Sequence, residues 1–329
     1  MLRSLATALL LFAVSAREPG PAALRAQPVD RSVFAMGTRL DFHLTGAVAA
    51  TLSHASEAAV REVERVEAAC STWRPASSWS VVNHAGGRSV PLALEWRKLL
   101  RVAIHWQRET AGAFDPVLGA LMRAWDIRGA GRLPSAAELS AARDASGAGL
   151  LTFDDAGGTV RLNNPAAALE EGGFVKGYAL DRALLQLRAL GARRGVLNFG
   201  GQLLVFGGPQ RVEVSDPADR GRPVMELTLH DASLSSSGTS EHGRHILNPA
   251  TGEPSPAWGG VSVVMPSALE ADILSTALYV MGPQRGLHWA DEHHVAAFFQ
   301  TVEGKRSTSV ALGALSPHLL PSRSPRSPN

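Results

Sequence analysis

An acidic and a hydroxyl side chain stand four residues apart in an apolar segment that is typical of a helix. Because Asp272 and Thr276 are spaced i, i+4, both oxygens project from one helical face. A carboxylate with a hydroxyl is a hard, oxygen-only pair that suits Mg²⁺, which takes one or two carboxylates and leaves its other positions to water and phosphate. The segment therefore predicts a magnesium site. An Asp that caps the helix start is the alternative that the pair alone leaves open.

A glycine-rich turn that contains a lysine is the second motif. It runs Glu170-Glu171-Gly172-Gly173-Phe174-Val175-Lys176-Gly177-Tyr178-Ala179 and leads into a predicted helix. Glycines before a helix let a ligand approach the backbone, whose free N–H groups point at an anion. Lys176 is one of only three lysines in the chain, and a cation at a helix start is unfavourable unless an anion lies beside it. The motif indicates an anion site, and an ordinary turn into a helix stays equally open.

A run of small hydroxyl residues, Ser235-Ser236-Ser237-Gly238-Thr239-Ser240-Glu241, is followed by the segment His245 to Gly252. Histidine is the usual general base near neutral pH, so His245 is a candidate for that role at the edge of a site. A histidine that is merely satisfied by the turn is the alternative. Two further tight turns, Gly112 to Pro116 and Asn198 to Gly201, stand at element ends, where ligands tend to bind in α/β proteins.

The elements that must position these residues alternate along the chain from residue 27. Alternation of apolar and polar residues predicts strands, and helical spacing of apolar residues predicts amphipathic helices. Expected strands are 31–45 (two strands about the Gly37 turn), 195–206, 210–215, 224–230 and 260–265, with a hairpin over 150–163. Expected helices are 50–69, 94–110, 116–125 (capped by Asp115), 177–190 and 268–281, the last ended by Gly282-Pro283.

Composition excludes several classes of protein. The chain has 329 residues, 45% of them hydrophobic, and a formal net charge of +2, which argues against disorder and against binding nucleic acid through phosphate neutralisation. The single cysteine, Cys70, excludes an internal disulfide. Residues 1–26 predict a signal peptide and linker, and the Pro/Ser-rich residues 316–329 a disordered tail. We therefore expect an exported, periplasmic protein that is soluble after cleavage, without stable membrane insertion.

Taken together, the motifs resemble the ApbE family of FAD:protein FMN transferases. The resemblance covers roughly residues 31–300 and rests on Met36-Gly37-Thr38, Ser71 to Pro75, Asn83 to Gly87, Gly112 to Pro116, Gly172 to Ala179, Asn198 to Gly201, Ser237-Gly238 with His245 to Gly252, and Asp272 to Thr276. It implies an α+β fold over residues 27–315, with antiparallel sheets flanked by helices in a two-lobed, T-fold-like architecture around a central FAD cleft. It also implies Mg²⁺-dependent transfer of FMN from FAD to a Thr or Ser hydroxyl, with release of AMP.

The resemblance also implies roles for individual residues. The acceptor would be the exported flavin domain of a membrane redox protein. His245 would be the base, and Gly173 (through its carbonyl), Asp272, Ser275 and Thr276 would hold the metal. The FAD site would be lined by Met36, Trp73, Ala113, Phe114, Asp115, Glu170, Lys176 and Ile246.

Three positions depart from the family pattern. Glu170 stands where Asp is usual, Asn248 stands where Asp is usual, and Ser80-Val81-Val82-Asn83 lacks the usual arginine. Because Asn248 cannot carry the negative charge that would stabilise an imidazolium, His245 would be a weaker base here. Two alternatives therefore stay open: an FAD pyrophosphatase that gives FMN and AMP, and a non-catalytic exported FAD-binding protein.

Overall fold

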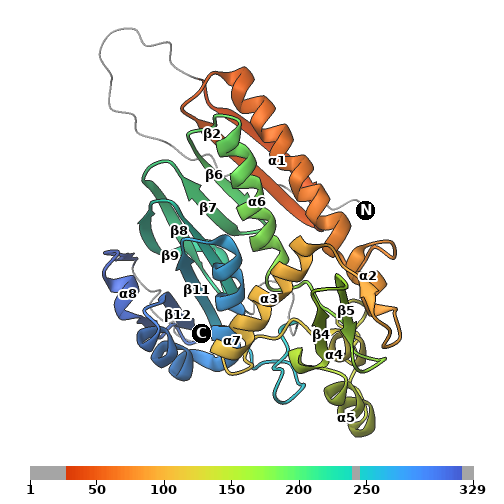
Figure 1. Cartoon of the computed structure of the whole chain (residues 1–329). Coiled ribbons are helices and arrows are strands. Elements are labelled where there is room, and N and C mark those ends of the chain that lie inside the picture. The colour runs from red at the N-terminus through yellow and green to blue at the C-terminus, as the bar shows by residue number, and fades with distance from the viewer. Residues whose placement is uncertain (1–26, 239–244, 321–329) are drawn as a thin grey trace, which may run out of the picture.

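Within residues 27–238 and 245–320, which the computed structural model describes, eight antiparallel strands form the main sheet (Figure 1). From one edge to the other they are β1 (Val29–Ala35), β2 (Thr38–Thr45), β6 (Arg194–Phe199), β7 (Gln202–Phe206), β10 (Ala232–Gly238), β11 (Gly259–Met265), β12 (Ala296–Thr301) and β13 (Arg306–Thr308). The predicted α+β class, with antiparallel sheets flanked by helices, is confirmed. The predicted signal peptide over residues 1–26 lies outside the described residues.

Both faces of the main sheet are covered. Successive residues of β7 point to opposite faces, since Leu204 packs in the cluster that contains α1 (Ala49–Cys70) and α6 (Val175–Ala189), while Val205 packs against β8 (Gln210–Asp216) and β9 (Asp219–Leu229). Figure 1 shows α1 and α6 side by side along the sheet. Burial on both faces explains why these strands have continuous apolar stretches in the sequence.

The remaining elements surround the sheet. They are α2 (Ser78–Asn83), β3 (Val90–Pro91), α3 (Leu94–Glu109), α4 (Gly119–Ala124), α5 (Ala136–Asp144), the 3₁₀ turn Ala148–Leu150, β4 (Leu151–Asp154), β5 (Thr159–Leu162), α7 (Ala268–Glu292), α8 (Val310–Gly313) and β14 (His318–Leu319). Strands β3, β5 and β4 form one small antiparallel sheet, and β14, β9 and β8 form another.

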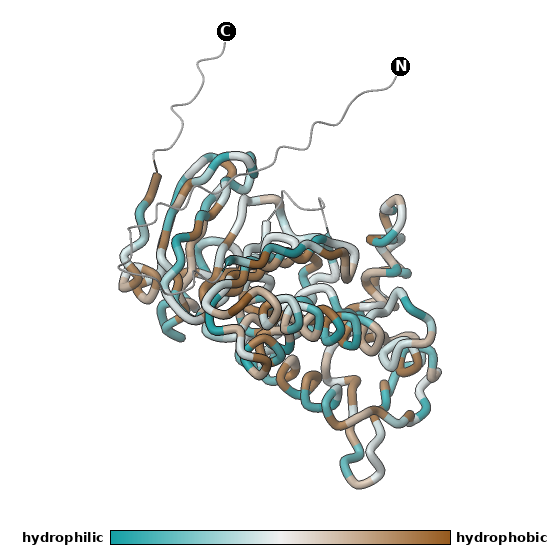
Figure 2. Tube along the Cα trace, turned by 90° about the horizontal axis from the view of Figure 1, so that it is seen from above, coloured by the Kyte–Doolittle hydropathy of each residue, from teal (hydrophilic) through white to brown (hydrophobic). Residues whose placement is uncertain are grey.

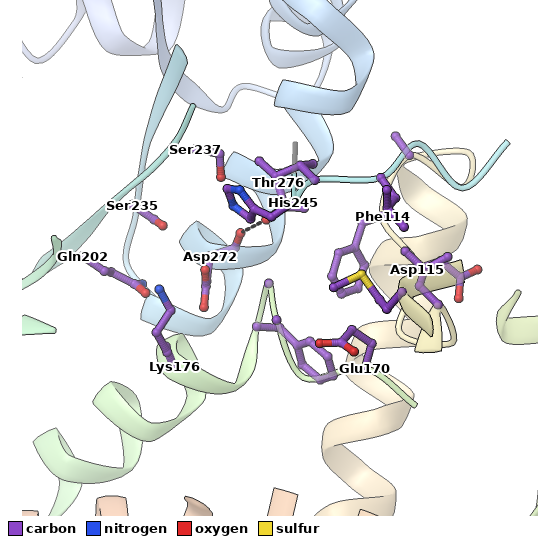
Figure 3. A pocket seen from close by; sticks show the side chains of 18 of the residues that line it. Phe114, Asp115, Glu170, Lys176, Gln202, Ser235, Ser237, His245, Asp272 and Thr276 are labelled. Atoms are coloured by element: carbon purple, nitrogen blue, oxygen red, sulfur yellow. Dashed lines mark hydrogen bonds between the residues drawn. The ribbon is translucent and has the colours of Figure 1, made fainter. Parts of the chain in front are cut away.

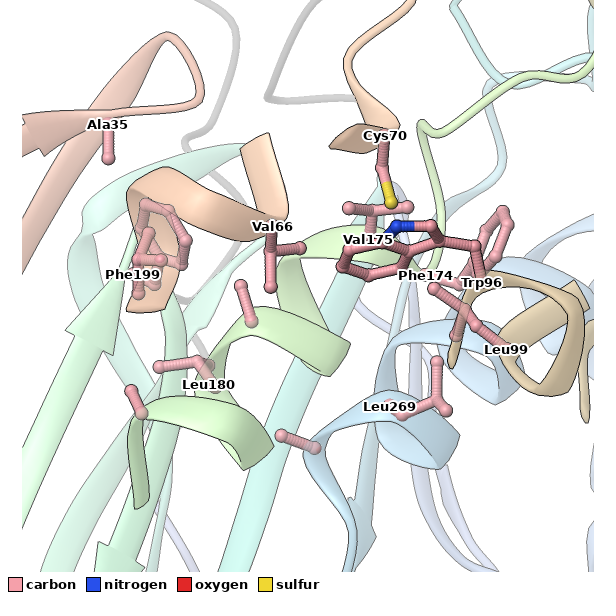
Figure 4. Close-up of a cluster of buried hydrophobic side chains, with 14 of the residues drawn as sticks. Ala35, Val66, Cys70, Trp96, Leu99, Phe174, Val175, Leu180, Phe199 and Leu269 are labelled. Atoms are coloured by element: carbon pink, nitrogen blue, oxygen red, sulfur yellow. The ribbon is translucent and has the colours of Figure 1, made fainter. Parts of the chain in front are cut away.

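The main core lies where helices α1, α2, α3, α6 and α7 meet the sheet (Figure 4). Phe174 stacks at a tilt on Trp79, with ring centroids 5.5 Å apart. Cys70 at the end of α1 is fully buried in this cluster, and burial raises the pKa of its thiol far above the usual range. Cys70 is therefore an unreactive core residue.

Helices α6 and α7 approach each other unusually closely. A Cβ on Gly177 would lie 2.2 Å from the carbonyl oxygen of Ala268 and 2.9 Å from Cβ of Asp272. Asp181, one turn further along α6, accepts hydrogen bonds from the backbone N–H groups of Ala268 (2.8 Å) and Leu269 (3.1 Å). The start of α7 is thus capped by a side chain of α6, which fixes Asp272 relative to the first turn of α6.

Replacing Gly177 with alanine is expected to destabilise the fold by about 1–3 kcal/mol, because the new methyl group meets backbone atoms that cannot move aside easily. Chemical denaturation of the purified variant measures the loss. Gly149→Ala is the matched control, since a Cβ there has nothing within 4 Å, and it should change stability by less than about 0.5 kcal/mol. Equal stability of the two variants would contradict the close packing.

Two predicted strand boundaries change. The strand expected over 195–206 is a hairpin, in which β6 and β7 are joined by Gly200 and Gly201 with φ angles of +60° and +98°. Glycines adopt these angles without strain, so the pair makes the turn. The strand expected at 224–230 begins earlier, at Asp219, because β9 pairs with β8 along its length. Strands β10 and β12 were not predicted.

Two predicted helix boundaries also change. Helix α4 begins at Gly119 and not at Pro116, because both carboxylate oxygens of Asp115 accept backbone N–H groups elsewhere, from Val117 (2.8 Å) and Ala148 (2.9 Å). Helix α7 is interrupted at Gly282 (φ +81°) as predicted, but it resumes and continues to Glu292. Proline suits the first turn of a helix, so Pro283 starts the second part.

The chain is ordered beyond the predicted domain end at residue 315. His318 and Leu319 form β14, which pairs with Glu226 and Met225 of β9. The tail predicted from residue 316 therefore begins with a paired strand, and residues 321–329 lie outside the described part.

Among the described residues, no helix combines the length and the apolar character needed to cross a bilayer. In Figure 2 polar and apolar segments alternate along the helices, as expected of helices that cover a core on one side.

Candidate functional site

A pocket lies where the start of α6, the first turns of α7, the end of β10 and the segments before and within α4 converge (Figure 3). All but three of the predicted site residues line it: Ala113, Phe114, Asp115, Glu170, Gly173, Lys176, His245, Ile246, Asp272 and Thr276. These residues come from four separate stretches of sequence. Their roles stay predictions, but the structure does bring them together.

Three predicted site residues are not in the pocket wall. Met36 occupies the tight β1–β2 turn with a φ of +47° and packs on the core. Trp73 is 64% exposed and its ring lies 4.6 Å from the guanidinium carbon of Arg128. Ser275 is fully buried behind the wall. Their predicted roles in binding FAD or metal remain untested.

Asp272 and Thr276 face the turn that contains Gly173. The Thr276 hydroxyl donates its proton to the backbone carbonyl of Asp272 (3.2 Å), so its lone pairs are left for another partner. A Cβ on Gly173 would lie 3.1 Å from that hydroxyl oxygen, so glycine leaves the space beside it open. A carboxylate, a hydroxyl and a nearby peptide carbonyl are an oxygen-only donor set. The residues present therefore fit Mg²⁺.

A chain of serine hydroxyls supports this wall from behind. Ser275 Oγ donates to the Asp272 carbonyl (3.0 Å), which uses its only proton. Ser235 Oγ (3.2 Å) and Ser237 Oγ (3.0 Å) must therefore donate to Ser275 Oγ. Their remaining lone pairs make this side of the pocket a hydrogen-bond-accepting surface, because both serines line it.

His245 and Ile246 stand at the rim, at the start of a turn tied to α4 and α5. Leu247 pairs with Pro254 in a β-bridge, and Ser255 N–H donates to the Ile246 carbonyl (2.8 Å). The indole N–H of Trp125 donates to the Gly252 carbonyl (2.7 Å). These contacts fix the backbone that carries the imidazole.

Glu170 has an unusual electrostatic environment. Burial, followed by repulsion from Glu171, raises its pKa to about 7, although Arg128 binds both carboxylates at 2.8 and 3.1 Å. Arg128 also donates to the Thr72 hydroxyl, which in turn donates to Glu171. A single guanidinium cannot neutralise the charge of both acids. Glu170 therefore stays largely protonated in mildly acidic solution.

Replacing Glu170 with glutamine is expected to change how stability depends on pH. Between pH 4.5 and 7 the folded state keeps a proton on Glu170 that the unfolded chain has released, so stability falls as the pH rises through this window. Glutamine does not titrate, so the variant does not lose this stability as the pH rises. Its melting temperature, relative to that of the wild type, should therefore rise from pH 5 to pH 8 by about 4 °C. A constant difference over that range would contradict the raised pKa.

Asp115 lines the pocket, but its carboxylate is already used. Both oxygens accept backbone N–H groups, those of Val117 and Ala148, and in Figure 3 the carboxylate points away from Asp272 and His245. Burial raises its pKa. Asp115 therefore fixes the turn 112–118, and its neighbours Ala113 and Phe114 face the pocket.

Some lining residues were not predicted. Leu118 and Met122 add apolar surface on the side of Phe114, and Gln202 adds a buried amide on the side of Lys176. Gln202 follows the Gly200-Gly201 turn directly. A polar residue between a double glycine and the apolar run Leu203 to Phe206 was a signal that the sequence contained.

Comparison with known proteins shows which family this chain resembles. The model of the ApbE family matches residues 36–299. FAD:protein FMN transferase from Rhodobacter capsulatus is 30% identical over 79% of this chain, which spans 52% of that relative. The protein of the same name from Haemophilus influenzae is 24% identical over 77% of this chain and 80% of its own length.

A solved structure agrees. The apo form of the flavinyl transferase ApbE from Pseudomonas stutzeri is 27% identical and aligns with a TM-score of 0.78, covering 89% of this chain and 99% of that one. The family match extends over most of the described residues and includes every residue that lines the pocket. The motifs, the fold and these relatives agree, and the chain belongs to the ApbE family.

Proposed function

We propose that this protein transfers FMN from FAD to a threonine or serine hydroxyl of an acceptor protein and releases AMP, in a reaction that needs Mg²⁺. The observation that supports this most is that one pocket combines Lys176, the Asp272–Thr276 pair and His245. Phosphoryl transfer depends on positioning and on neutralising phosphate charge, and an attacking hydroxyl needs a base. The relatives named above support the same activity.

The two sides of the pocket match the two kinds of surface in FAD. Phe114, Leu118 and Met122 give an apolar side suited to a flat ring, and Lys176 with Asp272 gives a polar side suited to a pyrophosphate. Glu170 lies on the apolar side, where its protonated form, which predominates below pH 7, can donate a hydrogen bond to a ring atom. Trp73 and Met36 would contact FAD only at the outside of this pocket.

In the reaction, Lys176 binds a phosphate oxygen and His245 takes the proton of the acceptor hydroxyl. The hydroxyl oxygen forms a bond to the flavin-side phosphorus, the pyrophosphate P–O bond breaks, and AMP carries away the displaced oxygen. Gly173, Asp272 and Thr276 would hold Mg²⁺, which when bound neutralises charge on the pyrophosphate. The acceptor we propose is an exported flavin domain of a membrane redox protein, in the periplasm.

The test combines the purified protein with FAD, Mg²⁺ and a candidate acceptor domain. After denaturing electrophoresis, flavin fluorescence should remain on the acceptor band, and AMP should appear in equal amount. Excess EDTA should reduce both to background, and added Mg²⁺ should restore them. AMP and free FMN with a dark acceptor would instead indicate a pyrophosphatase, and tight FAD binding without either product would indicate a carrier.

A further inference from the structure

Gln202 is a buried polar residue of the pocket that the reaction described above does not use. It is the first residue of β7, it is 4% exposed, and it lines the pocket on the side of Lys176 (Figure 3). Its side-chain carbonyl oxygen Oε1 is buried and accepts no hydrogen bond from the described residues. A buried acceptor without a donor is costly, so such an atom indicates a partner that arrives with a ligand or a rearrangement.

The orientation of this amide is fixed by its neighbours. Nε2 donates to the Ala268 carbonyl (2.7 Å) and to Ser233 Oγ (3.3 Å). Ser233 Oγ uses its own proton on the Leu203 carbonyl (2.7 Å), so it can only accept from Gln202. A flipped amide would bring two carbonyl oxygens within 2.7 Å of each other. The NH₂ group therefore faces Ala268, and Oε1 is left on the pocket side.

The same Ala268 carbonyl sets the position of Lys176. Gly177 packs so closely on this oxygen that a Cβ would lie 2.2 Å from it. The backbone next to Lys176 and the amide of Gln202 are therefore fixed against one atom. Lys176 makes no hydrogen bond or ion pair with the part of the chain that the structure describes, and its side chain reaches toward Gln202 in Figure 3.

We propose that Gln202 is a positioning residue, whose Oε1 accepts a hydrogen bond from the Lys176 ammonium and aims it at the phosphate of the bound substrate. The inference deepens the proposed function and rests on it. The ammonium has three donors, so one can bind Oε1 while the others face the anion. An ammonium held in this way loses less side-chain entropy when the anion binds, which strengthens binding of the phosphate-bearing ligand.

A double-mutant cycle with Gln202→Met and Lys176→Met tests this coupling. Binding of FAD is measured by flavin fluorescence in EDTA, without acceptor, so that catalysis and metal do not contribute. We expect each single variant to weaken FAD binding, Lys176→Met by about tenfold or more. The double variant should bind no more weakly than Lys176→Met alone, because Gln202 acts through Lys176. Binding of riboflavin, which lacks phosphate, should be unchanged.

Two controls keep the test decisive. Gln300→Met removes the other glutamine buried in the main sheet, which is 3% exposed and accepts from Arg306 (3.0 Å), and it should leave FAD binding unchanged. If Gln202→Met fails to fold, Ser233→Ala, which removes one anchor of the amide, should give a smaller loss of the same kind. Independent, multiplicative losses in the cycle, or an equal loss for riboflavin, would overturn the proposal. A wild-type protein that binds no FAD would instead contradict the proposed function.

Discussion

Replacing Asp272 with asparagine is expected to lower FMN transfer about a thousandfold or more while the protein stays folded. The side chain is 5% exposed, lies in the pocket and faces the Thr276–Gly173 region that fits Mg²⁺. Asparagine removes the negative charge that a hard cation requires. A metal that stabilises charge on a transferring phosphoryl group contributes several kcal/mol, and about 4 kcal/mol corresponds to a thousandfold in rate.

The fold should tolerate this change because asparagine keeps a contact that packs α7 against α6. Asp272 Oδ2 accepts the Gly177 N–H at 3.0 Å, and the amide oxygen of asparagine can accept it equally. The measurement is acceptor-bound flavin fluorescence per unit time at saturating FAD and Mg²⁺, with the melting temperature as a check on folding. Asp144→Asn, the same charge change on the exposed end of α5, serves as the control and should transfer normally. A D272N enzyme with wild-type transfer would refute the metal role.

Features that depend on local sequence were predictable. The turn at Gly37, helices α1 and α3, and the β4–β5 hairpin follow from apolar spacing and turn residues within a few positions. The Asp272–Thr276 pair was found in the same way, because i, i+4 spacing alone puts both residues on one helical face. In these elements, packing against the rest of the fold buries the apolar side chains but does not change the secondary structure that the local sequence prefers.

Features that depend on contacts across the fold were not predictable. The sequence predicts that Asp115 caps a helix. In the structure its carboxylate also accepts the backbone N–H of Ala148, 33 residues away, and α4 begins only at Gly119. The family resemblance implies that Ser275 helps to hold the metal, and this role stays a prediction. The burial of Ser275 behind the pocket wall depends on hydrogen bonds from Ser235 and Ser237, on a strand that was not predicted. In each case a partner remote in sequence decides where the side chain points.

Asn248, one of the three departures from the family pattern, has a local role in the turn that follows His245. Its side-chain oxygen accepts the Ala250 N–H (2.9 Å) and its backbone N–H donates to the Glu253 carbonyl (2.8 Å), so this residue shapes the 248–252 turn. An aspartate could make the same turn. The effect of the missing charge on His245, and with it the pyrophosphatase alternative, stays a prediction.

Replacing His245 with glutamine is expected to lower transfer to the acceptor by about 10²–10⁴-fold, the usual contribution of a positioned general base. FAD binding should be nearly unchanged, because Lys176 and the apolar side of the pocket remain. In Figure 3 the imidazole reaches into the pocket beside Thr276, on the same side as Asp272, where an attacking hydroxyl would meet the phosphate. The measurement is a single-turnover transfer assay with FAD prebound, which separates the chemical step from binding.

Asn248→Asp is the companion variant, since it changes charge three residues from His245 while preserving the turn. If Asn248 acts only in the turn, this variant should transfer at the wild-type rate within about twofold, because the exposed turn screens the added charge. A large gain in rate would show that position 248 acts on the imidazole after all. If H245Q transferred FMN at the wild-type rate, His245 would not be the general base. The acceptor hydroxyl would then be activated only by the charged groups of the site.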